Sequence, residues 1–173
     1  MRETSNLPPE GAVRFRLDLK SETETIDFAG RLASLLRPGD LVLLSGPLGA
    51  GKSTIARATI RALLGEPGLD VPSPTFLLVL PYEGRGRSIL HADLYRIDDP
   101  REVDEFGLDE DPDAIVLVEW PDRDPTLAGR ADLFLSLALP KHNQGRECEL
   151  TVVDPDRVAD YAELARTYER GGI

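Results

Sequence analysis

Apolar residues recur along this chain in three different patterns. Residues 13–19 alternate between apolar and polar side chains, which is typical of a strand with one buried face. Continuous apolar runs at 41–44 and 114–118 predict strands that are buried on both faces. Between residues 26 and 36, and again between 54 and 64, the apolar positions follow helical spacing. The chain is therefore expected to begin as strand, helix, strand and helix.

Local signals mark where these elements begin and end. Ser21 followed by Glu24 is a capping box, which predicts a helix N-terminus. Residues 37–40, with a proline and a glycine, end that helix. Pro72 and Pro74 are expected to hold the segment around them extended.

The rest of the chain predicts strands interrupted by turns and short helices. The expected elements are a strand at 76–80, a hairpin turn at 82–87, a strand at 88–93, a short acidic helix at 98–106 with Pro100 in its first turn, strands at 133–139 and 148–153 around a polar hairpin at 140–147, and a final helix from about Asp156 to Arg170.

The segment from Gly46 to Ser53 reads GPLGAGKS and fits the phosphate-binding pattern G-x-x-x-x-G-K-[ST]. It lies between a predicted buried strand and a predicted helix, which is the context that this pattern requires. Glycines let backbone N–H groups curl around an anion, and the helix N-terminus adds partial positive charge. Lys52 can then reach the β- and γ-phosphates, and the Ser53 hydroxyl can hold Mg²⁺. The sequence predicts a protein that binds a nucleoside triphosphate.

Together these elements indicate an α/β fold. We expect a single P-loop NTPase-like domain with a mixed sheet, a parallel centre, antiparallel hairpin additions and helices on both faces. Residues 1–12 are expected to form a flexible lead-in, and residues 13–173 the ATPase domain with its C-terminal helix.

Composition limits the function classes. The chain has 173 residues, of which 41% are hydrophobic and 29% charged, as in ordinary globular proteins. No apolar run approaches the length of a membrane span, so no membrane role is expected. Cys148 has no second cysteine to pair with, which favours a cytoplasmic, reducing compartment. A net charge of −11 argues against strong direct binding of nucleic acid, so a role with RNA would operate through protein partners.

Polar residues at predicted strand ends are candidates for chemistry on the nucleotide. Glu119 follows the second buried run, and Asp93 ends the strand after the hairpin. The carboxyl ends of parallel strands face one edge, so both carboxylates would point toward the phosphates. Thr75 lies where switch proteins place a hydroxyl that senses the metal and γ-phosphate, although capping of its own turn is an equal alternative. His91 points to the same side as Asp93, and a packed structural role is the commoner one for such a histidine. Trp120 could stack near the site or anchor its loop.

Four motifs occur in the same order as in a known family. They are Gly46 to Thr54, SPTF at 73–76, HADLYR at 91–96 and VEWP at 118–121. Together they resemble the bacterial TsaE family, the ATPase of tRNA threonylcarbamoyladenosine biosynthesis, over roughly residues 19–150. Most members carry threonine after the P-loop lysine, and Ser53 keeps the hydroxyl that the metal needs.

The resemblance implies a Mg²⁺-dependent, ATP-binding protein with weak ATPase activity. Such a protein acts with the TsaD and TsaB subunits, which transfer threonylcarbamoyl to adenosine 37 of tRNAs that read ANN codons. The residues that the resemblance assigns to the phosphates are Leu48, Gly49, Ala50, Gly51, Lys52, Ser53 and Thr54. It assigns Mg²⁺ to Ser53, Glu119 and Asp93, and hydrolysis to Lys52, Glu119, Asp93 and Thr75. Glu22, within the segment 21–25, and Arg146 are assigned to the adenosine side and the nucleotide.

Three other functions remain open on the sequence. A small metabolite kinase would need a lid with arginines, and Arg85 and Arg87 in the predicted hairpin turn are the clustered candidates. A GTPase switch is suggested by D-x-x-G at 104–107, but that segment lies on the predicted acidic helix, and the sequence has no guanine-reading Asn-Lys-x-Asp. The third is a nucleotide-loaded binding module for which hydrolysis is dispensable.

Overall fold

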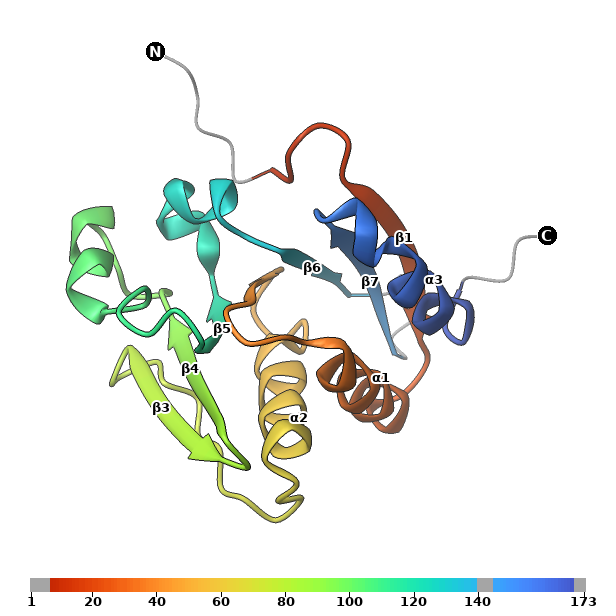
Figure 1. The fold of residues 1–173 in the computed structure, drawn as a ribbon, viewed down its shortest axis with the longest axis horizontal. Coiled ribbons are helices and arrows are strands. Elements are labelled where there is room, and N and C mark those ends of the chain that lie inside the picture. The colour runs from red at the N-terminus through yellow and green to blue at the C-terminus, as the bar shows by residue number, and fades with distance from the viewer. Residues whose placement is uncertain (1–6, 140–144, 170–173) are drawn as a thin grey trace.

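A mixed sheet of seven strands runs through the described part of the chain, residues 7–139 and 145–169 of a computed structural model (Figure 1). The strands are β1 Val13–Leu19, β2 Leu41–Ser45, β3 Val79–Gly84, β4 Arg87–Asp93, β5 Ile115–Glu119, β6 Leu133–Ala138 and β7 Arg146–Val152. Their order across the sheet is β1-β7-β6-β2-β5-β4-β3. The central strands β6, β2, β5 and β4 run parallel, whereas β1, β7 and β3 pair antiparallel. This arrangement confirms the predicted parallel centre with antiparallel additions.

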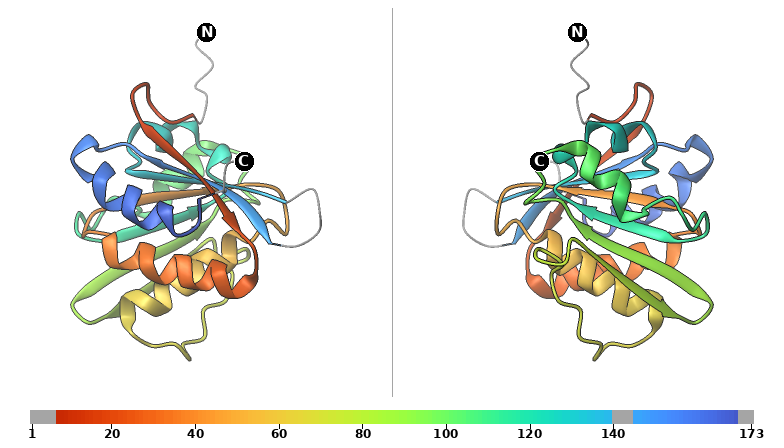
Figure 2. Two further views of the ribbon diagram at one scale, coloured as in Figure 1. Left: turned by 90° about the vertical axis from the view of Figure 1, so that its right-hand side faces the viewer. Right: turned by 90° about the vertical axis from the view of Figure 1, so that its left-hand side faces the viewer.

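Helices cover both faces of this sheet, but the two faces carry different kinds of helix. The α-helices of the described residues are α1 Glu22–Leu35, α2 Lys52–Leu64 and α3 Val158–Arg166. Their buried side chains share one core with the sheet, and Figure 2 shows α1 and α2 together on one side of it. The opposite face is covered mainly by the 3-10 helices η1 Pro100–Phe106 and η3 Pro125–Gly129 and the loops beside them. A further 3-10 helix, η2 Pro121–Arg123, follows β5, and η4 Pro155–Arg157 leads into α3. No helix within the described ranges is long and apolar enough to cross a membrane.

The alternation of side chains along β2 explains why both faces need cover. Val42 and Leu44 are buried in the core beneath the α-helices, and Leu41 and Leu43 are buried in the core on the opposite face. Each apolar side chain removed from water contributes about 1.5–3 kcal/mol to folding. The central strand is therefore held from both sides, which makes its carboxyl end a rigid support for the loop that follows.

The predicted start of α1 and the predicted end of α2 agree with the structure. The Ser21 hydroxyl accepts a hydrogen bond from the Glu24 backbone N–H at 3.1 Å and caps α1. Gly65 ends α2 in the left-handed conformation with φ of +65°, which a glycine adopts without steric cost.

The predicted strand at 76–80 is wrong in its first half. Phe76 and Leu77 are exposed in a turn, and β3 begins only at Val79. The Leu78 N–H closes this turn on the Pro74 carbonyl, and Leu78 has φ of +66°, which no strand accommodates. The hairpin turn is also tighter than the predicted 82–87, because β3 continues to Gly84. Arg85 and Gly86 both have positive φ, as a two-residue type I′ turn requires.

The C-terminal prediction needs a similar correction. Asp156 and Arg157 belong to η4, and α3 is shorter than the predicted helix because it begins at Val158 and ends at Arg166. The Asp18 N–H donates to the Tyr168 carbonyl at 2.8 Å, so the segment after α3 covers the outer edge of β1. Arg170, the first six residues of the predicted lead-in and residues 140–144 of the predicted hairpin lie outside the described residues, and the remainder of that hairpin includes the start of β7.

A buried ion pair joins this C-terminal segment to the start of β2. Arg157 is 4% exposed, and its guanidinium donates two hydrogen bonds of 2.7 Å to the Asp40 carboxylate. It also contacts the Leu35 carbonyl at 3.0 Å and the Tyr161 hydroxyl at 2.9 Å. The hydrogen bonds to Asp40 raise the pKa of Arg157 above its usual value. One side chain thus connects the end of α1, the start of β2 and the start of α3.

We expect Arg157→Lys to lower the free energy of unfolding by about 1–3 kcal/mol, because a lysine cannot reproduce the forked contact and leaves buried acceptors unpaired. Urea denaturation followed by circular dichroism measures this change. Arg166→Lys, on the exposed end of α3, is the matched control. Equal stability of the two variants would show that the Asp40 contact contributes nothing.

Candidate nucleotide-binding site

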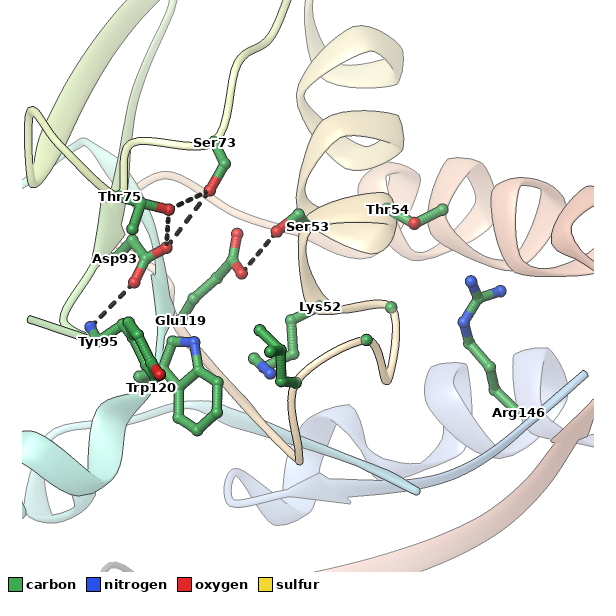
Figure 3. A pocket seen from close by; sticks show the side chains of 13 residues that line it. Lys52, Ser53, Thr54, Ser73, Thr75, Asp93, Tyr95, Glu119, Trp120 and Arg146 are labelled. Carbon is green, nitrogen blue, oxygen red and sulfur yellow. Dashed lines mark hydrogen bonds between the residues drawn. The ribbon is translucent and has the colours of Figure 1, made fainter. Parts of the chain in front are cut away.

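The parallel centre of the sheet brings the predicted site residues to one edge. β2 leads directly into the glycine loop, and its neighbour β5 ends in Glu119. β4 ends in Asp93, which pairs with Glu119 across the two strands. A cleft of about 320 Å³ lies at this edge (Figure 3). Its lining residues are Leu48, Gly49, Gly51, Lys52, Ser53, Thr54, Ser73, Thr75, Asp93, Tyr95, Glu119, Trp120 and Arg146.

The glycine loop is shaped by close backbone contacts. A Cβ atom on Gly46 would lie 2.4 Å from the Leu137 carbonyl oxygen, so only glycine fits between β2 and β6. Gly51 precedes α2 with φ of +105° and no side chain caps the helix. The first turn of α2 also contains no acidic residue. Its N–H groups and the positive end of its dipole are thus directed at the cleft, which suits an anion.

Lys52 is buried beneath this loop, with 4% of its surface exposed. Its ammonium group donates hydrogen bonds to the carbonyl oxygens of Gly46 at 2.7 Å and Pro47 at 2.9 Å. It lies 3.9 Å from the centre of the Trp120 ring, in a cation–π contact. Burial lowers the pKa of Lys52, and the nearby Glu119 and Asp93 carboxylates partly oppose this shift. The lysine is therefore held in position, with a charge that an incoming anion would stabilise.

Glu119 connects the loop helix to the sheet. One of its carboxylate oxygens, Oε2, accepts a hydrogen bond of 2.8 Å from the Ser53 hydroxyl. The other, Oε1, lies 2.8 Å from Nε2 of His91. Glu119 and His91 are each 1% exposed, although Ser53 itself reaches the cleft. This places a hydroxyl and a carboxylate side by side at the start of α2.

Asp93 holds the segment that follows α2. Its Oδ2 accepts hydrogen bonds from the Thr75 hydroxyl at 2.9 Å and the Ser73 hydroxyl at 3.3 Å. Its Oδ1 accepts from the backbone N–H of Tyr95 at 2.9 Å. Figure 3 shows the Thr75, Ser73 and Asp93 side chains together on one side of the cleft. Thr75 therefore contacts a candidate metal ligand, and does not merely cap its own turn.

Arg146 approaches the loop from the opposite side of the cleft (Figure 3). A Cβ atom on Gly51 would lie 2.1 Å from its Nε, which shows how closely the guanidinium lies over the loop backbone. Its Nη1 donates to the buried Thr25 hydroxyl on α1 at 3.1 Å. This contact links the segment 21–25 to the loop.

Two residues assigned by resemblance are not among those that line the cleft. Ala50 is completely buried, so only its backbone can take part in the loop. Glu22 does not line the cleft and instead lines a separate groove between α1 and α2, which shares Thr54 with the cleft. The remaining assigned residues all line the cleft.

Comparison with known proteins agrees with this arrangement. The protein-family model described as "Threonylcarbamoyl adenosine biosynthesis protein TsaE" matches residues 19–148. The chain belongs to the TsaE family. A relative in Rickettsia conorii, named tRNA threonylcarbamoyladenosine biosynthesis protein TsaE, is 43% identical over 103 residues. That match spans 59% of this chain and 58% of the relative. A protein of the same name in Aquifex aeolicus is 35% identical over 126 residues, which cover 73% of this chain and 88% of that protein.

The fold has a solved counterpart. The crystal structure of YdiB from Bacillus subtilis superimposes with a TM-score of 0.70, covering 92% of this chain and 99% of YdiB. The two sequences are 24% identical, so this likeness concerns the fold. The predicted α/β fold, with a mixed sheet, a parallel centre and helices, is thereby confirmed.

The donor groups of this TsaE-family chain fit a magnesium ion that arrives with a nucleotide. The described residues contain no group of three or more His, Cys, Asp or Glu side chains that could hold a metal by themselves. Mg²⁺ commonly takes one or two protein oxygens and completes its shell with phosphate oxygens and water. Ser53 and Glu119 provide such a pair of hard oxygen ligands.

Sequence reasoning gave no role to Ser73 and Tyr95, although both lie within quoted motifs, and left that of Trp120 open. Trp120 lines the cleft and also packs on the core, with its ring 4.9 Å from that of Tyr95. It has φ of +58°, an uncommon conformation for such a bulky residue. The strain at Trp120, next to Glu119, is a signal that only the folded backbone reveals.

Proposed function

We propose that this chain binds ATP with Mg²⁺ in the cleft and hydrolyses it slowly. The observation that carries this proposal is the 2.8 Å contact between the Ser53 hydroxyl and the Glu119 carboxylate, next to an uncapped helix N-terminus. Such a pair beside a phosphate loop suits Mg²⁺, which when bound would neutralise phosphate charge. In hydrolysis, water attacks the γ-phosphorus, the bond to the ADP oxygen breaks, and inorganic phosphate leaves.

Each side chain around the cleft has a role in this proposal. Lys52 and the loop N–H groups bind the phosphates, and Arg146 lies over the loop where it can contact the nucleotide. Ser53 and Glu119 would hold the metal, and Asp93 would orient water or add a further metal ligand. Thr75 would exchange its contact with Asp93 for one with the metal or the γ-phosphate, and so report which nucleotide is bound.

The alternatives are less well supported by the fold. Arg85 and Arg87 lie at the hairpin end of β4, whereas the cleft lies at the Asp93 end. Six residue steps along β4 separate these ends by about 20 Å, too far for a kinase lid. The D-x-x-G segment at 104–107 lies on η1 and its C-cap, outside the residues that line the cleft. A slow ATPase therefore remains better supported than a metabolite kinase or a GTPase.

We further propose that ATP hydrolysis serves threonylcarbamoyl transfer to adenosine 37 of tRNAs that read ANN codons, with TsaD and TsaB as partners. Support comes from the shared family and from relatives whose names state this biosynthesis. The match spans only 58% of the length of the Rickettsia conorii relative. A protein of this role would act in the cytoplasm, and the charge of −11 is consistent with contact through protein partners rather than directly with tRNA.

Co-purification with TsaD and TsaB tests this assignment. We expect Mg-ATP to increase the amount of this chain that elutes with the two subunits at least about tenfold, which corresponds to about 1.4 kcal/mol of coupling. The same complex should consume ATP during tRNA modification. If the chain does not associate with the two subunits in ATP, in ADP or without nucleotide, the proposed partnership is contradicted. The proposal that the chain alone binds ATP is tested separately by direct binding measurements.

A further inference from the structure

His91 lies directly behind the Glu119 carboxylate, outside the residues that line the cleft. β4 and β5 pair so that Asp93 lies opposite Glu119, and His91, two residues earlier, projects from the same face. The imidazole is 1% exposed, and its Nε2 is 2.8 Å from Oε1 of Glu119. It therefore contacts the carboxylate from the core side, while Ser53 contacts it from the cleft side.

The hydrogen-bonding roles follow from the chemistry of the two groups. An ionised carboxylate only accepts hydrogen bonds, so the proton of this contact lies on Nε2 of His91. Nδ1 of the same ring is buried and has no hydrogen-bond partner in the described residues. An unpaired buried polar atom costs about 1–3 kcal/mol. A residue present only for packing would avoid that cost, so the contact with Glu119 is what the imidazole provides.

We infer that His91 is a positioning residue for magnesium: its Nε2–H fixes one oxygen of Glu119, so that the other oxygen faces Ser53 and the metal. This inference rests on the proposed function, because it concerns how the same site holds Mg²⁺ with the nucleotide. Groups behind a metal ligand restrict the orientations of that ligand, and their loss commonly weakens metal affinity about 10- to 100-fold. Lys52 donates its hydrogen bonds to the carbonyls of Gly46 and Pro47, whereas the hydrogen bond of His91 is to Glu119. The loop and Lys52 would therefore bind phosphates as before when His91 is replaced.

The test compares His91→Leu with His91→Gln. Leucine fills similar space without a donor, whereas the glutamine amide places an N–H near the position of Nε2. We measure binding of a fluorescent ATP analogue first in EDTA and then across a Mg²⁺ titration, together with the thermal unfolding midpoint. For His91→Leu we expect unchanged affinity in EDTA and a Mg²⁺ midpoint raised about 10-fold or more. His91→Gln should recover most of that shift.

Thr59→Val is the matched control, because Thr59 is also buried and its hydroxyl has no partner in the described residues. It should leave the Mg²⁺ midpoint within about twofold of the unaltered protein. A Mg²⁺ midpoint in His91→Leu equal to that of the unaltered protein would overturn the inference. The inference would also be overturned if both His91 variants lost affinity for the analogue equally in EDTA and in Mg²⁺ and had a lowered unfolding midpoint. That result would indicate that the histidine has only a structural role. Failure of the unaltered protein to bind the analogue with Mg²⁺ would instead refute the proposed function.

Discussion

Replacing Lys52 with alanine is expected to weaken ATP binding at least about a hundredfold, which corresponds to roughly 2.7 kcal/mol. The ammonium is buried and held by two loop carbonyls, so a bound phosphate would meet a fixed charge that water screens poorly. Among the described residues, Arg146 is the other basic side chain that lines the cleft, and it lies over the loop rather than beneath it. Isothermal titration with Mg-ATP measures the loss.

The same variant should remain folded. Because burial lowers the pKa of Lys52, its charge opposes folding of the protein without ligand. Removal of that charge is therefore expected to change the free energy of unfolding by no more than about 1 kcal/mol. Arg130→Ala removes the same charge from an exposed position and should bind ATP normally. Near-normal affinity in Lys52→Ala would contradict the proposed phosphate site.

Glu119→Gln is expected to reduce the rate of ATP hydrolysis at least about a hundredfold while changing ATP affinity much less. The amide keeps the shape of the carboxylate but loses the negative charge that would bind Mg²⁺ beside Ser53. Loss of a positioned acidic group commonly costs about 10²- to 10⁴-fold in rate. Single-turnover phosphate release and equilibrium binding, measured on the same preparation, separate the two effects.

The control for this variant is Glu105→Gln on the exposed surface of η1, which should hydrolyse ATP at the normal rate. Repeated tRNA modification at the normal rate by Glu119→Gln would favour the binding-module alternative, in which hydrolysis is dispensable. Equal losses of ATP affinity and of hydrolysis rate would indicate instead that Glu119 mainly maintains the conformation of the loop.

Several parts of the fold could be predicted because their causes are local. The Ser21 cap, the buried run of β2 and the end of α2 at Leu64 each depend on a few neighbouring residues. The errors arose where local preference lost to context. Phe76 has a strand preference and Leu77 continues the apolar run, yet the turn closed by Leu78 on Pro74 leaves both exposed.

For this protein, the sequence by itself determined the glycine-rich loop between β2 and α2, the alternation of strands and helices, and the carboxylates at the ends of β4 and β5. These depend on spacing along the chain, which sets periodicity, caps and turns. The tertiary structure alone decided that His91 lies behind Glu119, that Arg146 lies over Gly51, and that Glu22 lies outside the cleft. Those contacts join segments far apart in sequence, and their geometry follows from strand register and helix packing, which no local pattern specifies.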